Sequence, residues 1–167
     1  MGGLSRGRWG GVGIMGIQLA FAMGLRPIAI DNGEERRKLC LKHGAEAFSD
    51  EDPVKSVLDL TKGGAHAVFV TAYQAYSTAH KYLGRRTGGK VMCIALPPTG
   101  SYPIGFPPDA IILRGQSWVG SLIGSLGDLD MVLDFAKRGK LTYEPTVIKL
   151  SEMNDAVQKL RRGQISG

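Results

Sequence analysis

The chain has 167 residues, of which 43% are hydrophobic and 22% charged, and its formal net charge is +6. These values describe one globular domain, and no apolar run reaches the roughly 18 residues that a membrane-spanning helix needs. The basic residues are scattered over predicted helices without a nucleic-acid-binding motif, so we expect neither a membrane nor a nucleic acid as partner. The glycine-rich start has no signal-peptide core, and the two cysteines indicate a reducing, cytoplasmic location without a disulfide framework. We expect both Cys40 and Cys93 to be buried thiols that pack as small apolar groups.

The first motif in chain order is the run Gly11-Val12-Gly13-Ile14-Met15-Gly16, which has the GxGxxG spacing. Such glycines let a strand turn into a helix and bring backbone N–H groups close to a pyrophosphate at the helix N-terminus. A buried strand should come before this motif, but residues 1–10 are glycine-rich and predict none. We therefore expect the first strand to be missing or remodelled. The alternative for the run is a turn that only packs a helix against a sheet.

Asp31 lies about 20 residues after the first glycine of the run and ends a short apolar segment. A dinucleotide-binding fold places a carboxylate there, where it accepts hydrogen bonds from the adenosine ribose. The glycine run, the helix after it and Asp31 together predict a nucleotide site.

The remaining sequence alternates short apolar runs with helical segments, which is typical of a parallel sheet with crossover helices. The predicted strands are residues 26–30, 45–49, 67–71, 90–96, 115–121 and 146–150. The predicted helices are residues 17–23, 34–43, 52–62, 75–83 and 126–138, and a last one capped by Ser151. In helix 126–138 we expect Val132, Leu133, Phe135 and Ala136 to face inward. Residues 97–108 are proline-rich and predict a loop.

This pattern predicts an α/β fold: a three-layer sandwich with a doubly wound, Rossmann-like parallel sheet of five or six strands. We divide the chain into a remodelled N-terminus (1–10), a dinucleotide-binding domain (11–140) and a C-terminal strand and helix (141–167).

Short segments spread over nearly everything after residue 10 carry a family resemblance: residues 11–16, 22–26, 28–31, 37–40, 44–48, 63–68, 95–97, 120–124, 133–136 and 139–140. Together they resemble the cofactor-binding half of the zinc-containing, medium-chain alcohol dehydrogenases, particularly the yeast and fungal type. The resemblance implies an NAD-binding domain in which a carboxylate at Asp31 favours NAD over NADP. It also implies that residues 141–167 pack toward a catalytic domain, and that the strand near Gly115–Ser121 pairs across a two-fold axis in a homodimer.

The resemblance places three groups of residues against the cofactor. The pyrophosphate group is Gly11, Gly13, Ile14, Met15 and Gly16. Asp31 takes the ribose hydroxyls and Arg36 lies along the adenine. The nicotinamide group is Val70, Thr71, Ala72, Ala95, Leu96 and Pro97.

The sequence also departs from the family. The family holds its zinc ions with cysteine and histidine, but Cys40, Cys93 and three isolated histidines cannot supply such a set, so we expect no zinc. Leu126 stands where the family has an arginine, and Ala95 stands where it has a glycine. No catalytic residue can be named, and we expect that the chain does not oxidise alcohols alone.

Three hypotheses follow for the function. The chain is the NAD(H)-binding domain of an alcohol dehydrogenase-like oxidoreductase, as a fragment or a naturally shortened product. Alternatively, it is a stand-alone enzyme that uses the former cofactor cleft for a non-redox reaction on a small molecule. Polar candidates for that reaction are Thr71, Tyr73, Tyr76, Thr99 and Tyr102, which form no recognisable acid–base pair. In the third hypothesis the chain is a non-catalytic assembly module.

Overall fold

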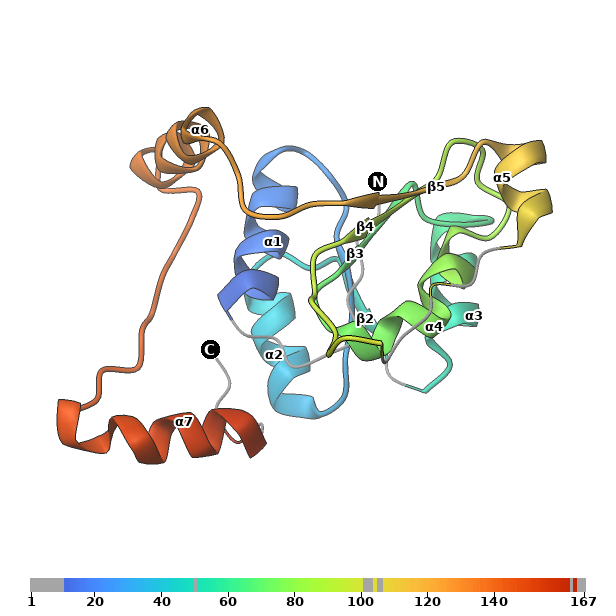
Figure 1. Ribbon diagram of the computed structural model, residues 1–167. Coiled ribbons are helices and arrows are strands. Elements are labelled where there is room, and N and C mark those ends of the chain that lie inside the picture. Colours follow the sequence, from blue (N-terminus) through green and yellow to red (C-terminus); the bar gives the residue numbers. More distant parts are fainter. Residues whose placement is uncertain (1–10, 50, 101–103, 105–106, 163, 165–167) are drawn as a thin grey trace.

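The computed structural model describes residues 11–49, 51–100, 104, 107–162 and 164, so the predicted remodelling of residues 1–10 lies outside the described residues. Five parallel strands form two sheets (Figure 1). In the first sheet β1 (Ile28–Ile30) pairs with β2 (Ala47–Ser49). The second sheet has the order β3-β4-β5, built from β3 (Ala67–Val70), β4 (Lys90–Cys93) and β5 (Ser117–Gly120). The predicted parallel α/β fold is therefore confirmed.

Helices connect the strands, as expected for parallel pairing. In chain order they are α1 (Gly11–Ala22), α2 (Glu34–Lys42), α3 (Pro53–Thr61), η1 (Tyr73–Ala75), α4 (Tyr76–Ala79), η2 (His80–Leu83), α5 (Pro108–Arg114), α6 (Leu126–Lys137), η3 (Leu150–Glu152) and α7 (Met153–Arg162). The predicted helix 75–83 is thus a short α-helix between two 3₁₀ turns.

Strand β1 shows how the layers are built. All three of its residues are buried, and successive side chains point to opposite faces of a strand. Ile28 and Ile30 belong to the main core, which also contains Val68 of β3 and Val91 of β4. Ala29 belongs to a second cluster, formed with side chains of α1 and α2. Helices therefore cover both faces of β1, and the main core joins the two sheets.

Local sequence explains where α3 begins and ends. Asp52 precedes the helix, and its carboxylate accepts the backbone N–H of Lys55 at 3.2 Å. Pro53 occupies the first helical position, where a backbone N–H would have no partner within the helix and its absence costs no hydrogen bond. After the last turn Lys62 adopts a left-handed conformation with φ 52°. The N–H of Gly63 returns to the Leu58 carbonyl at 2.9 Å, which completes a Schellman-type ending.

Residues 121–162, which we call the C-terminal arm, contain no buried residue. Figure 1 shows α6, a long extended stretch and α7 lying away from the two sheets. The arm is linked to α1 mainly through Gln18, whose side chain accepts the Thr142 backbone N–H at 2.7 Å and donates to the Thr142 carbonyl at 3.1 Å. An exposed ion pair joins Lys42 of α2 to Glu144 at 3.0 Å.

Several predictions for this part of the chain are wrong. Residues 146–150 form no strand, because no described strand lies beside them to complete a ladder. Leu133 and Ala136 of α6 are exposed and only Val132 and Phe135 are half-buried, because α6 contacts little more than α1. Ser151 is not a cap: it lies inside η3, which follows Lys149.

One helix was missed altogether. α5 begins at Pro108, the last residue of the proline-rich stretch that predicts a loop. Proline is tolerated in the first turn of a helix, so the composition that indicates a loop is also compatible with a helix start. The exposed side chains Ile111, Ile112 and Leu113 of α5 leave little apolar periodicity to reveal it.

Candidate functional site

The segments that follow β1, β3 and β4 form the candidate site, because parallel strands bring their carboxyl ends to one edge of a sheet. Asp31 directly follows β1 and Thr71 directly follows β3. After β4 the chain turns, and the N–H groups of Ile94 and Ala95 both donate to the Val70 carbonyl, at 3.3 and 3.0 Å. Val70, Thr71 and Ala95, all predicted to lie near the nicotinamide, are therefore brought together.

The first turn of α1 points to the same edge. Ile14 and Ile17 of α1 pack against Ala29 in the second core cluster, and a short connection returns the chain from the end of α1 to the start of β1. The helix thus runs opposite to the strand, so its N-terminus lies toward the carboxyl end of β1. Its N–H groups and helix dipole favour an anion there.

The glycine run differs from its prediction in one respect. Gly11, Gly13 and Gly16 all lie within helix α1 and not in a turn before it, and residues 1–10 lie outside the described part. Added Cβ atoms at Gly11 and Gly16 would meet open space. Gly13 and Ile14 are buried, whereas Met15 is half-buried. The Ile14 side chain consequently serves packing.

Asp31 is the most strongly positioned polar group of the site. The residue is 2% exposed, and its Oδ1 accepts the Asn32 backbone N–H at 2.8 Å and a guanidinium N–H of Arg36 at 3.2 Å. Arg36 lies on the first turns of α2, five residues later. A buried carboxylate needs such donors, and a charged donor stabilises its ionised form. Asp31 and Arg36, predicted separately for ribose and adenine, thus form one ion pair.

Cys40 of α2 belongs to the same electrostatic environment. Burial, followed by the nearby Asp31 charge, raises the pKa of its thiol to about 12, although the Arg36 charge acts in the opposite direction. The thiol is therefore neutral and packs as a small apolar group, as predicted. Cys93, also predicted to be buried, is only half-buried. Both cysteines are free thiols, in agreement with the expected lack of a disulfide.

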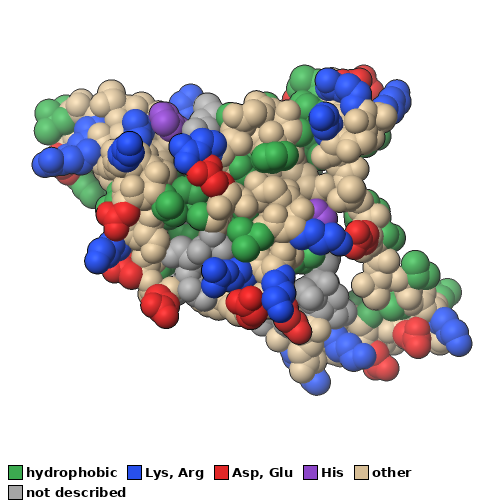
Figure 2. Space-filling model, turned by 180° about the vertical axis from the view of Figure 1, so that it is seen from behind, with side chains coloured by type: hydrophobic (Ala, Val, Ile, Leu, Met, Phe, Trp, Pro, Cys, Tyr) green, Lys and Arg blue, Asp and Glu red, His purple; other side chains and the backbone are tan. Residues whose placement is uncertain are grey.

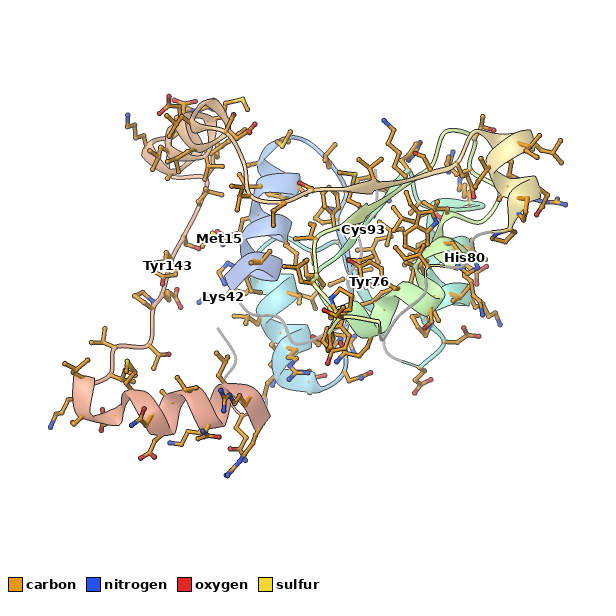
Figure 3. All side chains as sticks on the ribbon, in the orientation of Figure 1. Met15, Lys42, Tyr76, His80, Cys93 and Tyr143 are labelled. Atoms are coloured by element: carbon orange, nitrogen blue, oxygen red, sulfur yellow. The ribbon has the colours of Figure 1, made fainter. Side chains whose placement is uncertain are left out.

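Tyr76 of α4 fixes the turn after β4. Its hydroxyl donates to the Ala95 carbonyl at 2.7 Å, and its ring lies against that of Trp118 with centroids 6.1 Å apart. Figure 3 labels Tyr76 and Cys93 in the middle of the molecule, on neighbouring elements. Burial, followed by the neighbouring Cys93, raises the pKa of Tyr76 to about 12. Tyr76 is therefore a hydrogen-bond donor at neutral pH and cannot act there as a base.

The other described residues singled out in the sequence are half-buried or exposed. Ala72 and Pro97 are half-buried beside this turn, and Leu96 is 79% exposed. Leu126 is 80% exposed at the start of α6. Thr99 is exposed, and Tyr102 lies outside the described residues.

The sequence indicates Tyr76 as a polar candidate but does not predict its hydrogen bond to the Ala95 carbonyl. The residues around Tyr76 cannot predict this bond, because its acceptor lies 19 residues later in the sequence.

Within the part of the chain that the structure describes, no three histidine, cysteine, aspartate or glutamate side chains gather closely enough to hold a metal ion. None of its helices combines the length and the apolar character needed to cross a membrane.

Comparison with known proteins places this arrangement in a family. The family model described as zinc-binding dehydrogenase matches residues 11–138. An alcohol dehydrogenase of Geobacillus stearothermophilus is 34% identical over 161 residues, which are 95% of this chain and 46% of that protein. Alcohol dehydrogenase 2 of Caenorhabditis elegans is 33% identical, over 96% of this chain and 46% of its own length.

The fold comparison agrees. The crystal structure of the alcohol dehydrogenase from Aeropyrum pernix superposes with a TM-score of 0.85 at 30% identity, over 99% of this chain and 48% of that chain. The chain spans about half the length of the relatives it matches. It belongs to the zinc-binding dehydrogenase family, within which it has the fold of the alcohol dehydrogenase-like NAD-binding domain.

Proposed function

We propose that the chain binds NAD(H) along the carboxyl edge of its strands and supplies the cofactor half of an alcohol dehydrogenase-like oxidoreductase. NAD, when bound, accepts or donates a hydride. Gly11 and Gly13 would hold the pyrophosphate through backbone N–H groups, Asp31 the ribose hydroxyls, and Thr71 and Ala95 would lie on the nicotinamide side. The residues present fit such a ligand, because a helix N-terminus and a buried carboxylate share one edge.

The observation that carries this proposal is the burial of Asp31 at the end of β1. Burying a carboxylate costs free energy unless donors surround it, and here one backbone N–H and one guanidinium hold it in place. A carboxylate at this position also disfavours the 2′-phosphate of NADP by like-charge repulsion. The described part of the chain offers no acid–base pair for the alcohol itself, so the proposed role is binding and orienting the cofactor.

The experiment is a fluorescence titration of the purified chain with NADH. Asp31→Asn should weaken NADH binding by roughly 1–3 kcal/mol, the scale of one lost charge-assisted acceptor. Asp59→Asn, which changes an exposed carboxylate of α3, is the matched control and should leave the affinity unchanged. NADPH should bind more weakly than NADH to the unaltered chain. Equal NADH affinity in Asp31→Asn and in the unaltered chain would show that this edge is not the cofactor site.

We also propose a homodimer through β5. This strand lies at the outer position of the order β3-β4-β5, and its Val119 is 39% exposed. The neighbouring α5 exposes Ile112 at 78% and Leu113 at 76%. An exposed strand edge beside apolar side chains is a surface that a second copy can cover. Light scattering over a range of concentrations tests this, and Val119→Lys should shift the chain toward the monomer.

Two further points complete the proposal. The free thiols of Cys40 and Cys93 support a reducing compartment such as the cytoplasm. We expect no stoichiometric zinc in the purified chain and no turnover of ethanol with NAD, which elemental analysis and an NADH absorbance assay measure.

A further inference from the structure

A cavity of about 370 Å³ lies at the opposite end of the strands from the proposed cofactor site. Its lining includes Glu46, Ile28 and His66, which stand directly before β2, at the first residue of β1 and directly before β3. The other side is formed by Leu60, Thr61 and Lys62 at the end of α3, and by Arg26 and Arg86. The amino ends of three strands and the end of one helix therefore meet around it.

The charges around this cavity are mostly positive. Arg26 is neutralised by Glu46, with which it forms a two-point ion pair. Among the described residues no ion pair involves Lys62 or Arg86, so these two positive charges remain uncompensated by a carboxylate. His66 adds a largely exposed imidazole, and the partial loss of its hydration, followed by the Arg86 charge, lowers its pKa. Figure 2 shows the molecule from behind, with Lys and Arg side chains spread over the surface among acidic and hydrophobic ones.

Arg86 is held in position before any ligand arrives. Its Nε donates to the Gly64 carbonyl and one terminal nitrogen donates to the Thr61 carbonyl, both at 3.0 Å. A guanidinium has five N–H groups, so three remain for a ligand. The same bonds cap the carboxyl end of α3, whose partial negative charge would otherwise repel an anion.

Lys62 provides an independent indication. It occupies the left-handed position that ends α3, with φ 52°, where glycine is the preferred residue. A side chain there strains the backbone, and strained residues gather at sites where the side chain has a function. Gly63 and Gly64 follow directly in the sequence. The left-handed position is nevertheless occupied by a lysine, and this lysine lines the cavity.

From these observations we infer that this cavity is a binding site for the phosphate group of a small molecule. Lys62 and Arg86 match the two charges of a phosphate, and His66 can add an N–H donor. Ile28 and Leu60 offer an apolar wall, and the cavity of about 370 Å³ has room for more than a phosphate group alone, since one water molecule takes about 30 Å³. A phosphate monoester with a small apolar group fits both features better than free phosphate does.

The test follows the imidazole signals of the three histidines by NMR while inorganic phosphate, and separately phenyl phosphate, is added to the full chain. We expect the His66 signals to move and its pKa to rise, because an anion stabilises the imidazolium. His43 and His80 should stay unchanged. Phenyl phosphate should bind more tightly than inorganic phosphate. Saturating NADH should leave the His66 response intact, since the two sites lie at opposite edges.

Lys62→Gly separates binding from folding. It removes one charge and also relieves the left-handed strain, so the dissociation constant should rise about fivefold or more while the thermal midpoint does not fall. Lys55→Gln, which removes a charge elsewhere on α3, is the control and should bind like the unaltered chain. The inference is overturned if the His66 signals do not move, if NADH abolishes their response, or if Lys62→Gly binds phenyl phosphate as tightly as the unaltered chain.

Discussion

Helices α3 and α7 have similar lengths and both carry an apolar stripe, but only α3 buries a side chain. Val57 of α3 is fully buried in the main core, beside residues of β3 and η2. On α7, Met153, Val157 and Leu160 follow helical spacing and remain 52%, 41% and 57% exposed. An apolar stripe therefore fixes which face of a helix can be buried, and burial itself depends on a second surface.

The same contrast separates the two parts of the molecule. In the described residues before the arm, 11–120, which we call the body, strands of both sheets and the helices between them share one core. In the C-terminal arm every residue has its side chain at least partly exposed, and Figure 3 shows Tyr143 on the extended stretch far from the labelled core residues. The stability of the body should therefore be insensitive to side-chain changes in the arm.

The largest effect should come from a matched pair of leucine truncations. Leu83→Ala removes a fully buried side chain and should lower the free energy of unfolding by about 3 kcal/mol. Leu160→Ala removes a half-exposed side chain from α7 and should change it by less than about 0.5 kcal/mol. Chemical denaturation measures both. Comparable losses would mean that α7 is covered in solution and that the contrast is wrong.

A smaller effect is expected at the link between body and arm. Gln18 is 5% exposed and bonds the backbone of Thr142 in both directions. Gln18→Leu keeps the size of the side chain but removes these bonds, which should cost about 1–2 kcal/mol and speed amide exchange in the arm. Hydrogen exchange and denaturation test this together.

Lys42→Ala serves as the comparison, because it removes only the exposed ion pair with Glu144. Such pairs contribute little in water, so no change in stability should be measurable. If Lys42→Ala loosens the arm as much as Gln18→Leu does, the buried amide is not the main anchor.

The smallest effect concerns pH and the start of α6. The backbone N–H and the hydroxyl of Ser125 donate to the Asp128 carboxylate and hold the pKa of Asp128 below its usual value. A lowered pKa adds stability above the unfolded-state value, and this is lost as the pH falls through the folded-state value. Amides in the first turn of α6 should therefore exchange faster in acid. Ser125→Ala should raise the pKa of Asp128, and an unchanged pKa would refute the capping interaction.

The sequence predicts the body well because its signals are local. The apolar runs around Val68 and Val91 identify β3 and β4, and the Asp52-Pro53 pair identifies the start of α3. The strand ends are predicted less well. The predicted strand 90–96 stops at Cys93, because the N–H groups of the next two residues both donate to the Val70 carbonyl. That bend depends on the Val70 carbonyl of β3, which lies more than 20 residues earlier, so the residues around Cys93 alone cannot predict it.

The arm was predicted less well because its structure depends on neighbours. Residues 146–150 have strand composition, but a strand exists only where another one offers hydrogen bonds. In the candidate site, too, local features are predicted and contacts between distant residues are not. Asp31 follows from its place after an apolar run, whereas its ion pair with Arg36 and the bond from Tyr76 to Ala95 required the fold.

The order of the strands in the two sheets allows the chain to fold stepwise during synthesis. Each ladder joins a strand to the next one in the sequence: residue 28 faces 47, residue 67 faces 90, and residue 90 faces 117. Because proteins are made from the N-terminus, each ladder can close once the next crossover and strand have left the ribosome. The body can thus form stepwise, with the arm added last and anchored through Gln18 on the first helix.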